Sequence, residues 1–102
     1  MKIIIERLKL DELKQIATAT FGNLVKAVVD IEKELIAVDA ELHSDLEALL
    51  LENGSKQKNL WGIYLYPEIQ GEEFVEFDSM INIRPSQGNR SRSIEDEEYA
   101  RK

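Results

Sequence analysis

Residues 74–93 read FVEFDSMINIRPSQGNRSRS, and this stretch decides the fold because a strand pattern begins in it and then stops. Apolar and polar side chains alternate from Phe74 to Arg84, which predicts a strand, since successive side chains of a strand point to opposite faces of a sheet. Pro85 ends the strand because proline has no N–H to donate to a sheet. A loop follows, and a final helix is predicted from Ser93, with acidic residues at 95–98 in its first turn. The chain upstream supplies the scaffold that this strand completes.

The two faces of the predicted last strand differ in character. One face is predicted to meet the core, and the other to face water or a site. The core face comprises Val75, Phe77, Ser79, Ile81 and Ile83, and the open face comprises Glu76, Asp78, Met80, Asn82 and Arg84.

Hydrophobic patterns predict a strand and a helix at the start of the chain. The strand runs from Lys2 to Arg7, because consecutive isoleucines are β-branched and a continuous apolar run suits a strand covered on both faces. The helix runs over residues 11–20, with Leu13, Ile16 and Ala17 on one stripe, and Gly22 with Asn23 supplies the stop.

Residues 24–39 are predicted to form a β-hairpin. Apolar side chains alternate before and after residues 32–34, which form the turn. This turn contains neither glycine nor asparagine, so a turn longer than two residues is expected. A helix over the whole of residues 24–53 is the competing interpretation, and the density of valine and isoleucine before Asp39 argues against it.

Residues 41–53 carry the clearest helical pattern, and Gly54 supplies the stop. Ser44 with Glu47 matches a capping box, which would start the helix later, and Asp39 is a rival N-cap. An aromatic strand is predicted over residues 60–66. We therefore predict one α+β domain over residues 1–102, in the order β-α-β-β-α-β-β-α, with a mostly antiparallel sheet and the helices packed on one face.

Composition limits the classes of partner and compartment. The net charge is −7, which opposes binding to nucleic acid as a general polyanion. The chain has no cysteine, which fits a reducing cytoplasm. The apolar run at the N-terminus is too short for a signal peptide or a membrane span. We expect a cytoplasmic protein without nucleic-acid, membrane, metal or cofactor partners.

The loop after the predicted last strand is the first candidate site. Its guanidinium, amide and hydroxyl groups are those that bind phosphate and carboxylate ligands. The candidate anion-binding residues are Asn82, Arg84, Asn89, Arg90 and Arg92. The competing interpretation is a solvent loop whose arginines pair with acids, with Glu76, Asp78 or residues 95–98 as partners of Arg84.

The second candidate is the acidic cluster around His43, the only histidine. On a helix His43 and Glu47 share a face, so they could hold a divalent cation or an acid–base pair. Acidic residues are nevertheless common at a helix N-terminus for dipole reasons alone. No metal site can be completed from the sequence, and His43 stands as an acid–base candidate only.

The third candidate is the aromatic strand. Trp61 shares a face with Ile63 and Leu65, whereas Tyr64 and Tyr66 share the other face. Tyrosines on an open face stack on a ligand or a partner chain, although packing within the sheet is their more common use.

Four segments resemble a small uncharacterised family classed as a domain of unknown function. They are VKAVVDIEKE, ELHSDLEALLLENGS, LWGIYLYP and, most distinctive, INIRPSQGNRS. The resemblance implies a compact α+β domain and no assigned activity, so no catalytic residue is carried over. It also implies that the last helix is incomplete here.

A short chain with much apolar surface and no recognisable catalytic set favours a non-enzymatic binding or assembly module that forms a homodimer. The alternative is a small enzyme or ligand-binding protein that recognises a phosphorylated or carboxylated metabolite, with Arg84 and Arg90 as the anion clamp. This alternative requires His43 and Arg84 to lie on the same side of the domain.

Overall fold

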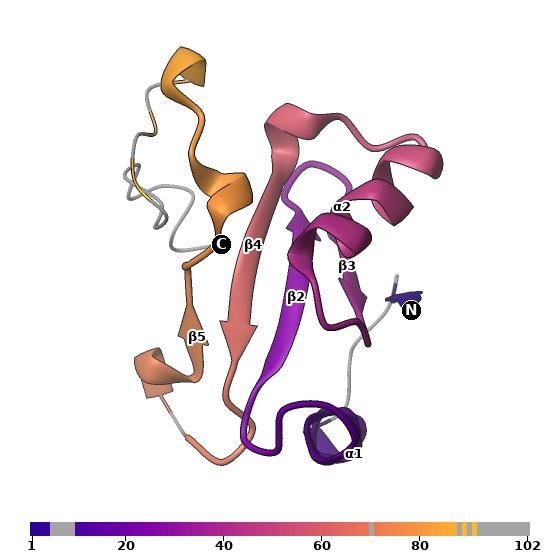
Figure 1. The fold of residues 1–102 in the computed structure, drawn as a ribbon, viewed down its shortest axis with the longest axis vertical. Coiled ribbons are helices and arrows are strands. Elements are labelled where there is room, and N and C mark those ends of the chain that lie inside the picture. Colours follow the sequence, from indigo (N-terminus) through magenta and orange to yellow (C-terminus); the bar gives the residue numbers. More distant parts are fainter. Residues whose placement is uncertain (5–9, 70, 88, 90, 92–102) are drawn as a thin grey trace.

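A five-stranded antiparallel sheet organises the computed structural model, which describes residues 1–4, 10–69, 71–87, 89 and 91. The strand order is β1-β3-β2-β4-β5, so the β2–β3 hairpin lies in the middle of the sheet (Figure 1). The strands are β1 (Lys2–Ile4), β2 (Val25–Asp30), β3 (Leu35–Val38), β4 (Leu60–Leu65) and β5 (Val75–Glu76), and the helices are α1 (Leu10–Ala19) and α2 (His43–Glu52). The predicted α+β class, the mostly antiparallel sheet and the order of elements up to the last strand are confirmed. The helix predicted from Ser93 lies outside the described residues.

The β2–β3 hairpin closes through a four-residue turn at residues 31–34, so the turn is longer than two residues, as predicted, and begins one residue before the predicted 32–34. The Asp30 carboxylate accepts hydrogen bonds from the backbone N–H of Glu32 at 3.0 Å and of Lys33 at 2.9 Å. Glu34 adopts a left-handed conformation with φ of 56°. An aspartate that bonds to the backbone two residues on replaces the turn chemistry that glycine usually provides.

Both helices end where the sequence predicts, but α2 begins differently. Leu42 occupies the N-cap position without a side-chain hydrogen bond, and Asp39 lies before the helix with φ of 72°. The helix starts later than residue 41, as the alternative start predicts, but the capping box of Ser44 with Glu47 does not form because the Glu47 carboxylate turns inward to Arg84.

The two helices pack on opposite faces of the sheet, which corrects the expectation that they share one face. The α1 side chains Leu13, Ile16 and Ala17 pack with the odd-numbered β4 residues Ile63 and Leu65. The α2 side chains Leu46 and Leu50 pack with Leu60, Val28 and Ala37. Because neighbouring side chains of a strand point to opposite faces, these two clusters lie on different sides of the sheet. The continuous apolar runs of β2 and β3 supply both.

The predicted strand from Phe74 to Arg84 is the main error in the sequence-based fold. Only Val75–Glu76 forms a strand, and Met80–Asn82 forms a short 3₁₀ turn, η3. The Ser79 hydroxyl caps this turn by accepting a hydrogen bond from the N–H of Ile81 at 3.3 Å. The predicted faces are therefore exchanged at the end of the segment, where Asn82 is fully buried and Ile83 is exposed.

Gly62 allows residues 77–87, which we call the edge segment, to lie directly against β4. A Cβ atom on Gly62 would lie 2.5 Å from the Cβ of Ser79 and 3.2 Å from Cδ2 of His43. Any side chain at position 62 would therefore push the edge segment away from the sheet.

Replacing Gly62 by Ala is expected to lower the free energy of unfolding by about 1–3 kcal/mol, the usual cost of overpacking. Chemical denaturation measures this loss. Introducing Ser79→Gly as well should recover part of it, because the Ser79 side chain is the closest obstacle. If the loss is the same in the Ser79→Gly background, the edge segment does not lie where we describe it.

Candidate functional site

Three of the candidate anion-binding residues are described, and they lie on the side of the loop that faces β4, away from solvent. Asn82, Arg84 and Asn89 have exposed fractions of 0%, 8% and 4%. The structure therefore brings them together, as the sequence predicts, but on the inner side of the loop. Arg90 and Arg92 lie outside the described residues, so their part in an anion site stays a prediction.

Asn82 occupies the place that a neighbouring strand would have. Its Oδ1 accepts a hydrogen bond from the N–H of Gly62 at 2.7 Å, and its Nδ2 donates to the carbonyl of Gly62 at 3.0 Å. One side-chain amide thus satisfies both backbone groups of a buried strand residue, which would be costly to leave unpaired.

Arg84 satisfies the next outward-facing carbonyl of β4, that of Leu60, two residues before Gly62. Its Nη2 donates a hydrogen bond to the carbonyl of Leu60 and lies 3.7 Å from Oε2 of Glu47. The guanidinium carbon lies 4.9 Å from the centre of the Trp61 ring, which is within cation–π range. Burial lowers the pKa of Arg84, and the Glu47 carboxylate opposes that shift. Among the described residues, the acid that pairs with Arg84 is thus Glu47 on α2, and residues 95–98 lie outside the described residues.

Asn89 closes the loop by fixing its two ends. Its backbone pairs with Arg84 through two hydrogen bonds of 2.6 and 3.1 Å, and its Nδ2 donates to the carbonyls of Asn82 at 2.6 Å and Ser91 at 3.0 Å. The Asn89 side-chain amide, which suggested ligand binding, therefore donates its hydrogen bonds within the loop.

His43 lies near the same edge, at the first turn of α2. Its Nε2 donates a hydrogen bond to the carbonyl of Ile63 at 2.8 Å, and its ring lies 5.3 Å from the ring of Tyr64. His43 and Glu47 share the inward side of the helix, as predicted, and reach neighbouring parts of β4. In the part of the chain that the structure describes, no group of three or more histidine or acidic residues could hold a metal ion.

Tyr64 and Tyr66 lie on the face of the sheet that carries α2, next to the first turn of this helix. Lys26, Tyr64 and Glu76 are directly paired across β2, β4 and β5, so their side chains form one row. Tyr66 donates a hydrogen bond from its hydroxyl to Glu76 at 2.8 Å. Burial, followed by this hydrogen bond, raises the pKa of Tyr66 to about 12. Both tyrosines are half-buried: Tyr64 packs on His43, and the ring centres of Tyr64 and Tyr66 lie 6.5 Å apart.

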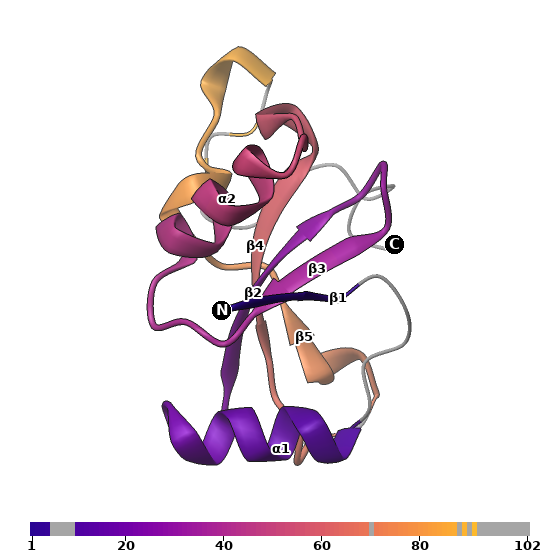
Figure 2. The same cartoon turned by 90° about the vertical axis from the view of Figure 1, so that its right-hand side faces the viewer.

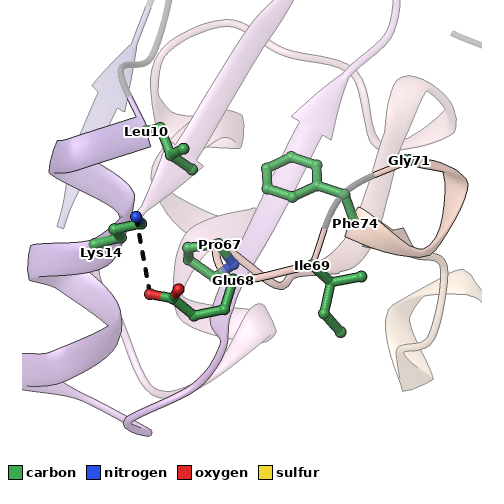
Figure 3. Close-up of a pocket in the computed structure, with 7 residues that line it drawn as sticks. All are labelled: Leu10, Lys14, Pro67, Glu68, Ile69, Gly71 and Phe74. Carbon is green, nitrogen blue, oxygen red and sulfur yellow. Dashed lines mark ion pairs between the residues drawn. The ribbon is translucent and has the colours of Figure 1, made fainter.

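A separate hollow of about 420 Å³ lies between α1 and the chain after β4 (Figure 3). It is lined by Leu10, Lys14, Pro67, Glu68, Ile69, Gly71 and Phe74. The one ion pair drawn there joins Lys14 to Glu68 at 4.0 Å between exposed side chains. Its lining is mixed, because apolar side chains lie beside the charged Lys14 and Glu68.

The opposite side of the sheet has an apolar border that the sequence-based interpretation missed. Figure 2 looks toward β1 and shows no described element beyond this strand. The side chains along this border are only partly buried on both faces of the sheet: Ile3, Ile4, Leu35, Ile36 and Leu49. We call these five residues the apolar edge. The isoleucine run indicated an apolar strand, but we predicted that this strand is covered on both faces.

Replacing Arg84 by Ala is expected to lower the free energy of unfolding by about 3–5 kcal/mol, because Glu47 would be left without its cationic partner. Chemical denaturation measures the change. The exposed Lys56→Ala is the control and should stay within about 0.5 kcal/mol of the parent. An Arg84→Ala protein of parental stability, together with phosphate-dependent NMR shifts of the Arg84 guanidinium in the parent, would favour the anion site instead.

The Tyr66 pKa provides a test by pH titration. The ring-carbon NMR signal of Tyr66 should titrate near 12, well above the ordinary value of 10.0. Because the folded state retains the phenolic proton longer than the unfolded state, Tyr66 should reduce stability as pH rises from 10.0 toward 12. Glu76→Gln should lower the pKa only in part, since burial is the larger cause. An unchanged pKa in Glu76→Gln would contradict a role for Glu76.

Comparison with known proteins identifies a family and no activity. No curated protein and no solved structure matches the chain. Among the described residues, no helix has the length and apolar character needed to cross a membrane. A family described as "Protein of unknown function (DUF5674)" matches residues 2–102, which confirms the resemblance to a domain of unknown function. The chain therefore belongs to the DUF5674 family.

Proposed function

We propose that this chain is a cytoplasmic, non-enzymatic assembly module that works as a homodimer. The observation that carries the proposal is the apolar edge, where both hydrophobic clusters reach the border of the sheet without full cover. Burial of such surface in a second protein chain is favourable by about 25 cal/mol per Å². The absence of cysteine from the sequence supports the cytoplasmic location.

The chemistry of the described polar residues also favours an assembly role. Asn82 and Arg84 satisfy backbone groups of β4, and His43 Nε2 donates to the carbonyl of Ile63. A side chain that holds the fold in this way loses those contacts if it turns to a substrate.

A ligand-binding or enzymatic role is the second candidate, because His43 and Arg84 do not lie on opposite sides of the domain. They contact Ile63 and Leu60 of the same strand, and Glu47 stands one helical turn from His43. Against this role, a metabolite anion at Arg84 would have to replace Glu47 at a guanidinium that is 8% exposed. We therefore rank it below assembly.

Sedimentation velocity over a range of micromolar concentrations tests the assembly proposal. The parent protein should shift from monomer to dimer as its concentration rises. Leu49→Gln should weaken the dimer about tenfold or more, because a two-fold interface contains the lost apolar side chain twice, at roughly 1 kcal/mol each.

Leu51→Gln is the matched control, since Leu51 lies on the flank of α2 that also carries Glu47, away from the apolar edge. It should leave the dimer unchanged. Thermal unfolding should confirm that both variants are folded. A parent protein that stays monomeric throughout would remove the homodimer from the proposal.

A further inference from the structure

Strand β1 has an apolar side chain on each face, although it lies at the border of the sheet. Ile3 packs on the cluster under α2, and Ile4 packs on the cluster under α1. Both remain partly exposed. Natural proteins usually protect an exposed edge with charges, proline or a bulge, because an open apolar edge is a template for another strand.

The alternation of hydrogen bonds across the sheet shows which backbone groups of β1 point outward. Gly62 directs its N–H and carbonyl to Asn82, so its partner Val28 must direct its own groups to β3. Val28 pairs with Ala37, and Ala37 pairs with Ile3. Because antiparallel pairs alternate between bonded and non-bonded, the N–H and carbonyl of Ile3 point away from β3. Those of Ile4 point to Ile36.

We propose that the second copy of the chain binds by pairing its β1 antiparallel to the β1 of the first copy, with the two-fold axis between the two Ile3 residues. This inference rests on the proposed assembly function and specifies its interface. Each Ile3 N–H donates to the Ile3 carbonyl of the partner copy, and the two five-stranded sheets become one continuous sheet.

A second copy suits this edge for a reason of symmetry. A two-fold axis perpendicular to the sheet places a strand antiparallel to its own copy, so the bonding pattern is satisfied in both copies at once. On the α2 side Ile3 lies directly opposite Ile3 of the second copy, so these two partly exposed side chains bury each other. β1 then becomes an internal strand, which is the environment that its isoleucine run suits.

Ile3→Pro tests the pairing with little effect on the protomer. Proline lacks the N–H that the partner strand requires, and that N–H makes no bond to β3. Ile3→Val is the matched control, because valine is close to proline in size and keeps the N–H. Sedimentation should show dimerisation on the order of 100-fold weaker in Ile3→Pro, which loses both symmetric hydrogen bonds and leaves two acceptors unpaired. Ile3→Val should dimerise nearly as the parent does.

Amide hydrogen exchange on the unmodified protein gives a second measurement that does not depend on the folding of a variant. The Ile3 amide should be protected at concentrations where the dimer forms and should exchange rapidly on dilution. The Ile4 amide, which bonds to Ile36, should stay protected in both conditions.

The outcomes separate this inference from the assembly proposal. A dimer that Leu49→Gln weakens but Ile3→Pro leaves intact, with an Ile3 amide that exchanges rapidly in the dimer, would overturn the strand pairing and keep the assembly role. A protein that is monomeric at every concentration would overturn both. Selective loss of the dimer in Ile3→Pro with dimer-dependent protection of the Ile3 amide would establish the interface.

Discussion

The outer edge of β4 imposes the constraint on which the rest of the structure depends. This strand lies on the border between the sheet and the irregular end of the chain, and its backbone groups need partners. Strand β5 and the residue before it supply them beside Tyr64 and Tyr66. Beyond that point, the amide of Asn82 and the guanidinium of Arg84 take over. A buried cation in turn requires Glu47 on α2, so the helix, the strand and the edge segment are joined by one set of polar contacts.

This arrangement explains which parts of the fold the sequence could predict. The hairpin, both helices and β4 follow from local periodicity and from stop signals such as Gly22 and Gly54, and the structure confirms them. The alternation after Phe74 suggested a strand of the same kind. Periodicity cannot show that the side chain of Asn82, and not its backbone, completes the sheet, because that pairing depends on Gly62 twenty residues earlier.

The same reasoning applies to the candidate site. The sequence predicted correctly that Asn82, Arg84 and Asn89 lie together, because they are close along the chain. The patterns could not tell whether these polar groups face outward to a ligand or inward to the sheet. The decisive partners, Leu60 and Glu47, are distant in sequence and have no local signature. The apolar edge was missed for the opposite reason: a run of isoleucines indicates burial but not which molecule provides the cover.

The hydrogen bonds of Asn82 and Arg84 to the edge of β4 also have a consequence for the growing chain. During synthesis the hairpin, α2 and β4 leave the ribosome before the edge segment does. Until Asn82 and Arg84 emerge, the first half of β4 presents unpaired N–H and carbonyl groups beside Trp61, an open template for another strand. The nascent protein is therefore vulnerable to aggregation at β4 in this interval, and this edge of the sheet is protected only when Asn82 and Arg84 arrive.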